Sequence, residues 1–185
     1  MVRALLAGQK TQTRRPMKPI PTGETVHGGE IWPLHPGGGV MECQLAASGE
    51  ILWVREPFAH AADGLEFEAD VGPAQAAKRQ WRPGRFLARP HCRRWLRVTR
   101  VWPQRLQAMT ASEAEAEGFP PALRQTTLQT SQQARDWFRD LWDSIYGTGE
   151  LAGDLTWQQN PWVWAIEFKL LTKAPPGWRE SLEAK

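Results

Sequence analysis

One segment of the chain carries a helical pattern of apolar residues, which predicts an amphipathic helix over residues 131–146. Its apolar side chains recur at spacings of three and four residues, at Ala134, Trp137, Phe138, Leu141, Trp142 and Ile145. This spacing places them along one face of a helix, and Gly147 then ends the pattern. Apolar stripes of this kind pack into a core, so we expect the two tryptophans to be buried rather than free to stack on a ligand.

Three other segments have the patterns of strands. Residues 162–170 alternate between two sides and predict a strand with one buried face, formed by Trp162, Trp164, Ile166, Phe168 and Leu170. Residues 51–54 form a short apolar run that is typical of a strand. Residues 95–102 predict another strand, with one apolar side that Arg100 interrupts. The residues of that apolar side are Leu96, Val98 and Trp102.

Two shorter helices accompany the predicted strands. The first covers residues 2–7, where apolar residues lie on one side. The second covers residues 111–117, because Thr110 and Glu113 have the spacing of a capping box and Gly118 follows as a stop signal. Both helices are short, so we expect them to flank the strands rather than to form a layer of their own.

Proline and glycine mark long excursions between the predicted elements. Residues 16–48 predict a long loop or a hairpin, and residues 59–92 predict irregular structure with one hairpin near residues 65–71. Beyond the last strand the pattern is lost, so we expect residues 173–185 to be a flexible tail. The elements follow each other without a β-α-β rhythm. The sequence therefore predicts a single α+β domain over residues 1–172, built on a small, strongly curved sheet or barrel.

The composition points to a possible class of ligand, because tryptophan and arginine are both abundant. The chain has 11 Trp against one Tyr, and arginine accounts for 17 of its 23 basic residues. Tryptophan stacks on flat partners and arginine recognises phosphate and base edges, so the pair favours a nucleic-acid ligand, with a tightly packed core as the alternative. Ten basic residues and no acidic residue lie between Lys78 and Arg105, although the net charge is only +3. This stretch predicts a surface for a polyanion or, alternatively, a solvated loop.

Features that the chain lacks argue against several classes of protein. No apolar run approaches the roughly 20 residues of a membrane helix, and the apolar part of the first eight residues is too short for a signal peptide. Cys43 and Cys92 have no metal-type spacing and cannot form a disulfide framework, and the four histidines are scattered. We therefore expect a cytoplasmic protein that uses no metal or cofactor and binds no membrane.

The segment Ala7-Gly8-Gln9-Lys10-Thr11-Gln12-Thr13-Arg14-Arg15 resembles the signature of the ASCH domain, a superfamily of PUA-like β-barrels. That signature reads Gly-x-Lys-x-x-(Glu or Thr)-x-Arg and follows a first short helix. Three later phrases, in the family's order, are similar to phage- and prophage-encoded ASCH proteins: Trp53-Val54-Arg55-Glu56, Leu141-Trp142-Asp143-Ser144-Ile145 and Asn160-Pro161-Trp162-Val163-Trp164. The resemblance implies a PUA-like small β-barrel with short flanking helices, which recognises RNA or a nucleoside in a cleft beside the barrel.

One branch of this superfamily consists of small bacterial amidohydrolases that deacetylate N4-acetylcytidine. Their motif, Ala-Gly-x-Lys-Thr-x-Thr-x-Arg, matches residues 7–15, and the resemblance implies that Lys10, Thr13 and Glu117 are catalytic. The chemistry is reasonable in itself, because a lysine with a lowered pKa can act as the base for a threonine nucleophile while a glutamate orients the lysine or passes a proton to N4. Alternatively, Lys10 and Thr13 contact phosphate and ribose without chemistry, and Glu117 is a solvated charge beside Glu113.

Further residues are predicted to hold the substrate or a nucleic-acid strand. Arg14 and Arg15 are expected to clamp phosphate or substrate, with ion pairing to acidic residues as the alternative. The other predicted ligand contacts are Thr11, Arg55, Arg82, Arg85, Arg89, Arg93 and Arg94. The expected partner is a nucleoside or RNA, with DNA as a further option. Two rival functions remain: a non-catalytic RNA- or DNA-binding module, and a ribonuclease.

The chain departs from the family pattern in two places. Family members begin with a short apolar strand ahead of the first helix, whereas only Met1 precedes that helix here. The excursions at 16–48 and 59–92 are absent from the minimal amidohydrolases. If these excursions cover the cleft, the substrate is expected to be larger than a free nucleoside or differently modified.

Overall fold

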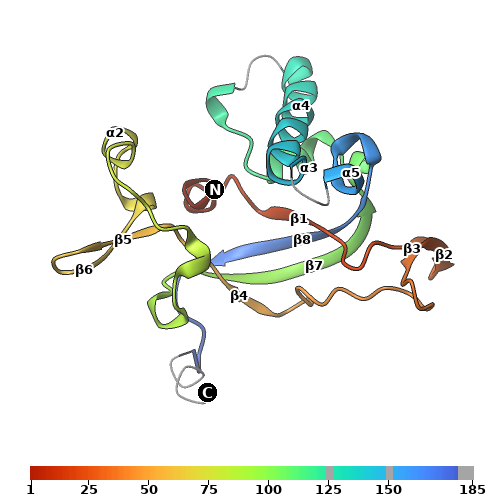
Figure 1. Cartoon of the computed structure of the whole chain (residues 1–185), viewed down its shortest axis with the longest axis horizontal. Coiled ribbons are helices and arrows are strands. Elements are labelled where there is room, and N and C mark those ends of the chain that lie inside the picture. The colour runs from red at the N-terminus through yellow and green to blue at the C-terminus, as the bar shows by residue number, and fades with distance from the viewer. Residues whose placement is uncertain (124–126, 149–151, 179–185) are drawn as a thin grey trace.

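The centre of the computed structural model, which describes residues 1–123, 127–148 and 152–178, is a four-stranded antiparallel sheet. The sheet is strongly curled and forms half of a small barrel (Figure 1). In their order across the sheet, its strands are β1 (Gln12–Pro16), β8 (Trp162–Leu171), β7 (Trp95–Arg105) and β4 (Ile51–Trp53). The α+β architecture and the three strands that the apolar patterns predict are confirmed, whereas β1 lies in a polar segment for which no strand was predicted.

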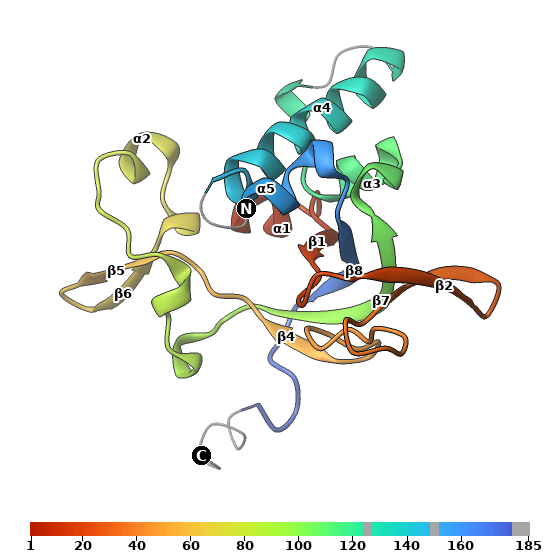
Figure 2. The same ribbon diagram turned by 45° about the vertical axis from the view of Figure 1, so that its right-hand side comes forward.

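Two hairpins project from the sheet on opposite sides (Figure 2). They confirm the hairpin alternative for residues 16–48. The second hairpin exists as expected but lies at 58–67 rather than near 65–71, where residues 68–70 form a 3-10 turn. The first hairpin pairs β2 (Gly23–His27) with β3 (Glu30–Leu34), and the second pairs β5 (Phe58–Ala61) with β6 (Gly64–Phe67). The second is followed by the short helix α2 (Pro73–Ala76) and lies among 3-10 turns at 68–70, 84–86 and 89–91.

Helices cover one face of the sheet near β1 and β8 (Figures 1 and 2). They are α1 (Val2–Leu6), α3 (Ala111–Ala116), α4 (Thr127–Tyr146) and α5 (Ala152–Leu155). The predicted capping box is present at the start of α3, where the Thr110 hydroxyl accepts a hydrogen bond from Glu113 N and the Glu113 carboxylate accepts one from Thr110 N. Among the described helices, α4 included, none is both long and apolar enough to span a bilayer.

The strand β8 is buried on both faces, in contrast to the single buried face predicted for residues 162–170. Its residues Trp162, Trp164, Ile166 and Phe168 pack on the side of Leu96 and Val98. Val163 points the other way and packs against the helices, where the core consists of Leu106, Met109, Ala114, Phe119, Ala134, Phe138 and Trp142. The prediction was wrong because α3 and α4 cover the second face along 162–166, and the polar alternation reappears only at Glu167 and Lys169.

A β-bulge in β7 changes which of its residues face the core. The register with β8 shifts between Val98 and Arg100, so the alternation of sides changes phase there. Val101 therefore packs against the core in line with Val98, whereas Trp102 lies on the other side with Arg100 stacked 4.6 Å from its ring. The predicted apolar side of Leu96, Val98 and Trp102 is correct for the first two residues only, and the bulge explains why Arg100 interrupted the pattern.

The segment after β8 does not behave throughout as a flexible tail. Trp178 is buried and packs edge-on against Trp95, with the ring centroids 5.6 Å apart. The prediction for residues 173–185 is therefore wrong at Trp178, because a single large apolar side chain fixes the segment without any periodic pattern. Residues 179–185 lie outside the described part of the chain.

Candidate functional site

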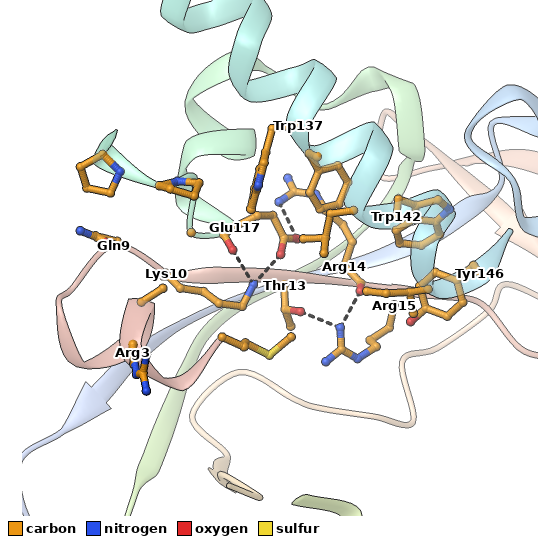
Figure 3. Close-up of a pocket in the computed structure, with 18 residues that line it drawn as sticks. Arg3, Gln9, Lys10, Thr13, Arg14, Arg15, Glu117, Trp137, Trp142 and Tyr146 are labelled. Carbon is orange, nitrogen blue, oxygen red and sulfur yellow. Dashed lines mark hydrogen bonds and ion pairs between the residues drawn. The ribbon is translucent and has the colours of Figure 1, made fainter. Parts of the chain in front are cut away.

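A cavity of about 370 Å³ lies between the edge strand β1, the end of α3 and the helix α4 (Figure 3). It has a polar floor and apolar walls. The floor is formed by Lys10, Thr13, Arg14, Arg15 and Glu117, and the walls include Pro120, Pro121, Trp137, Phe138, Leu141, Trp142, Ile145 and Tyr146. The three residues predicted to be catalytic therefore line one cavity, although more than 100 residues separate Glu117 from the other two.

Lys10 is buried and holds the floor together through its ammonium group. Its Nζ donates hydrogen bonds to Glu117 Oε2 at 2.6 Å, to the Glu117 carbonyl at 2.9 Å and to the Gln12 carbonyl at 2.9 Å. The pKa of Lys10 is lowered, chiefly by burial; the charge and the hydrogen bond of the Glu117 carboxylate oppose this shift, and the cations of Arg15 and Arg14 add to it. The lysine is thus easier to deprotonate than an exposed one, as a general base requires.

Backbone pairing holds the segments of Lys10 and Glu117 side by side. Thr11 N donates to the Ala116 carbonyl at 2.8 Å, and Lys10 forms an isolated β-bridge with Glu117. Directly after this bridge, Gly118 has a φ of +102°, and a Cβ there would stand 3.2 Å from Ala4 Cβ and 3.3 Å from Lys10 Cβ. The close approach of the two segments therefore depends on a glycine at the end of α3.

Glu117 and Arg14 are both buried, and their burial distinguishes between the alternative roles that the sequence left open for each of them. Glu117 is 5% exposed, so the interpretation of it as a solvated charge is wrong. The side chain of Arg14 has no exposed surface and donates to Glu117 Oε1 at 3.3 Å and to Glu113 Oε1 at 3.1 Å. Arg14 lines the cavity, but its charge is matched within the protein, in agreement with the ion-pairing alternative rather than the clamp.

Thr13 and Arg15 form the part of the floor that is partly open. Thr13 Oγ1 accepts a hydrogen bond from Arg15 Nη1 at 2.7 Å, and the same nitrogen donates to the Arg14 carbonyl at 2.8 Å. In Figure 3, the Thr13 hydroxyl lies between the Lys10 ammonium and the Arg15 guanidinium. Two cations thus stand near one hydroxyl, an arrangement that stabilises negative charge developing on or beside that oxygen.

The helix α4 contributes an aromatic wall to the cavity, which the sequence pattern did not reveal. Trp142 is buried as predicted, and Tyr146 packs on it with ring centroids 4.4 Å apart. Trp137 is only half-buried and lines the cavity, so the expectation that both tryptophans are core is wrong for Trp137. Burial raises the pKa of Tyr146, which keeps its hydroxyl protonated and able to donate a hydrogen bond.

The other predicted ligand residues lie outside the cavity. Thr11 is exposed and does not line it. Arg93 is held in ion pairs with the buried Glu56 and with Asp70, and Arg94 is half-buried. Arg55 and three arginines of the 59–92 excursion each have a guanidinium stacked 4.6–5.6 Å from a ring: Arg55 on Trp53, Arg82 on Phe58, Arg85 on Phe86 and Arg89 on Trp178. We refer to these four pairs as the arginine stacks.

The acid-free stretch from Lys78 to Arg105 is not free of acidic neighbours in space. Its Arg79 pairs with Glu66, its Arg93 with Glu56 and Asp70, and its Arg105 with Glu24. Carboxylates from distant segments therefore neutralise part of a charge that the sequence displays as uniform. The stretch also spans several elements, because it runs from the end of α2 through two 3-10 turns to the end of β7.

Two further residues of the cavity escaped the sequence analysis. Arg3 and Gln9 both line it, one in α1 and one in the turn that follows. The available signals were their position beside the motif and, for Arg3, the absence of acidic residues from positions 1–23.

In the part of the chain that the structure describes, no group of three His, Cys, Asp or Glu side chains could hold a metal ion. Comparisons of the chain with models of protein families, with curated proteins and with solved structures gave no match.

Proposed function

We propose that the cavity binds an N4-acylated cytidine and hydrolyses its amide bond. The observation that carries the proposal is the arrangement of Lys10, Thr13 and Glu117 around one cavity that has an aromatic wall. The resemblance of residues 7–15 to the ASCH signature supports the same activity, and a curled half-barrel is compatible with a PUA-like fold. The proposal therefore rests on a motif and on geometry that point to the same chemistry.

The walls of the cavity suit a flat, largely apolar base. Trp137 offers a partly exposed ring, and Leu141 and Ile145 extend the apolar surface beside it. Stacking of a base on an aromatic side chain contributes about 1–3 kcal/mol in proteins that bind single-stranded nucleic acids. A base held against this wall places its exocyclic N4-acyl group toward the polar floor, where Thr13 lies.

The first half of the proposed reaction transfers the acyl group to the protein. Lys10, in its neutral form, takes the proton of the Thr13 hydroxyl while Oγ1 attacks the acyl carbonyl carbon. Arg15 donates a hydrogen bond to the resulting oxyanion, and Glu117 keeps Lys10 in position through Oε2. When the carbon–nitrogen bond breaks, Lys10 returns the proton to N4 and cytidine leaves, with the acyl group on Thr13.

The second half regenerates the protein. A water molecule attacks the acyl-threonine, and neutral Lys10 takes one of its protons. When the bond to Thr13 Oγ1 breaks, Lys10 gives this proton to the threonine oxygen and the carboxylic acid leaves. The sum of both halves is the amide plus water giving cytidine plus a carboxylic acid, with Lys10 and Thr13 restored.

The proposal is tested by incubating the protein with N4-acetylcytidine and following cytidine by liquid chromatography. We expect turnover by the wild type, retained turnover by Thr13→Ser and a loss of at least about a hundredfold in Thr13→Ala, since the nucleophile is removed. Thr22→Ala is the matched control, because it removes the same hydroxyl at an exposed position outside the cavity. Absence of turnover by the wild type, or equal turnover by Thr13→Ala, would contradict the proposal.

A second candidate function, binding of a single RNA or DNA strand, is favoured by the arginine stacks. Arg55, Arg82 and Arg85 are exposed, and each stands over an aromatic ring. Guanidinium groups held in this way keep free edges for phosphate and free faces for bases. This surface is separate from the cavity, so it could bind a strand with or without hydrolysis.

Strand binding is tested by gel shift with a short RNA and with the equivalent DNA. The affinity should fall steeply as salt is raised, because arginine contacts to phosphate release counterions. The double variant Arg82→Gln with Arg85→Gln should weaken the shift, whereas Arg139→Gln, on the outer face of α4, should not. Absent binding, or binding that does not respond to salt, would remove this candidate.

A further inference from the structure

The four cationic side chains that line the cavity are of two kinds. Lys10 and Arg14 are enclosed, and both pair with carboxylates. Arg15 and Arg3 instead donate to neutral oxygen atoms, and within the described residues neither forms an ion pair with a carboxylate. The cavity therefore carries positive charge that the protein itself does not match, concentrated on its two less buried arginines.

Arg3 is held at the rim by the excursion rather than left to move freely. Its Nη2 donates to the Glu68 and Val71 carbonyls, both at 2.9 Å, although the side chain is exposed. Carbonyl groups fix the guanidinium without neutralising it, and none of the described residues accepts a hydrogen bond from its Nη1 or Nε. A fixed cation with free donors at the edge of a cavity is suited to bind an anion, because little side-chain entropy is lost on binding.

The positions of the two arginines separate their roles. Arg15 contacts Thr13, so it is placed beside the reacting acyl group. Arg3 lies in α1, on the far side of Lys10 from Arg15, and in Figure 3 both guanidinium groups are on the side of the floor opposite Trp137. A ligand with its base at Trp137 and its acyl group at Thr13 can extend its sugar and any phosphate toward Arg3.

We propose that Arg3 binds a phosphate group and that the ligand of the cavity is a nucleoside monophosphate rather than a free nucleoside. This inference rests on the proposed function for the placement of the base and the acyl group. A phosphate monoester carries about two negative charges at neutral pH, which complements the unmatched charge of Arg3. The 59–92 excursion thereby gains a role in substrate choice, because two of its carbonyls hold Arg3.

The test compares the binding of cytidine and cytidine 5′-monophosphate by isothermal titration calorimetry. We expect the monophosphate to bind about tenfold more tightly or better at low salt, because a charge-assisted contact is added. In Arg3→Gln this advantage should disappear while cytidine binds as before, and in Arg3→Lys part of it should remain. Arg139→Gln, which removes an arginine from the outer face of α4, should retain the full advantage.

The possible results separate this inference from the proposed function. Equal binding of cytidine and its monophosphate, or an advantage that survives in Arg3→Gln, would overturn the phosphate assignment, whatever the turnover of N4-acetylcytidine. An oligocytidylate that binds more tightly than the monophosphate would overturn it in favour of a strand. A monophosphate advantage that depends on Arg3, in a protein without amide hydrolysis, would support the phosphate site and reject the hydrolase.

Discussion

Arginine serves two different purposes in two regions of this molecule, the cavity floor and the arginine stacks. On the floor, Arg14 is enclosed and its charge is matched by Glu113 and Glu117. In the stacks, Arg55 and Arg82 are exposed and are held by aromatic rings. The difference teaches that the location of an arginine relative to carboxylates, and not its density in the sequence, decides whether its charge is available to a ligand.

The largest expected effect comes from breaking the floor. Glu117→Gln removes the carboxylate that lies against both Lys10 and Arg14, and we expect the free energy of unfolding to fall by about 3 kcal/mol, since a buried charge loses its partner. Urea denaturation followed by circular dichroism measures this change. Glu30→Gln, at an exposed position of β3, is the control and should change the value by less than about 0.5 kcal/mol. Equal effects of the two variants would contradict the description of the floor.

A smaller effect is expected from the backbone that brings the floor together. Gly118→Ala places a side chain at a φ of +102° and against Ala4 and Lys10, so we expect a loss of about 2 kcal/mol in the free energy of unfolding. Gly72→Ala is the control, because the structure shows open space there and the φ is −64°. A neutral Gly118→Ala would show that the approach of α3 to Lys10 is looser than the contacts indicate.

The pH dependence should distinguish the two regions. Lys10 must be neutral to take the Thr13 proton, so hydrolysis should rise about tenfold per pH unit below the pKa of Lys10 and level off above it. Burial lowers the pKa of Lys10, Arg15 and Arg14 lower it further, and Glu117 opposes them. The plateau of the hydrolysis rate should therefore begin at a pH below the ordinary pKa of lysine. Strand binding by the arginine stacks should not vary over the same range, since arginine stays charged. A flat pH profile of hydrolysis would contradict Lys10 as the base.

The smallest expected effect is on the stability contributed by the stacks. Arg82→Gln removes an exposed guanidinium from the rings of Phe58 and Phe86, and we expect the free energy of unfolding to fall by less than about 1 kcal/mol. The measurement is again urea denaturation, with the Glu117→Gln variant for comparison. A loss as large as that of Glu117→Gln would mean that the stacks are structural, and the contrast between the two regions would disappear.

Elements with a strong apolar period could be predicted from the sequence, and the polar edge of the sheet could not. The patterns at 131–146 and 162–170 place α4 and β8 within a few residues of their positions. The strand β1 was missed because Gln12, Thr13, Arg14 and Arg15 are all polar, so no apolar residue marks a buried face. A strand whose side chains build a polar site lacks the signal by which strands are recognised.

The candidate site was predicted in part, and the limits have identifiable causes. The motif located Lys10 and Thr13 on one segment, but the convergence of Glu117 depends on the contact between α3 and residues 10–11, which is nonlocal. Trp137 was assigned to the core because an apolar stripe shows which residues share a helix face, but not which part of that face the core covers. Trp137 and Leu141 face the cavity, Ala134 lies in the core, and Phe138 belongs to both.

The hydrogen bonds that Lys10 and Arg15 make to β1 also bear on intermolecular pairing of this edge strand. The strand β1 is at the edge of the sheet, and the carbonyls of Gln12 and Arg14 accept from Lys10 Nζ and from Arg15 Nη1. An edge strand with free carbonyls is a template for intermolecular pairing, and charged side chains at the edge prevent it. We therefore expect a variant that lacks both Lys10 and Arg15 to form intermolecular β-structure more readily than the wild type.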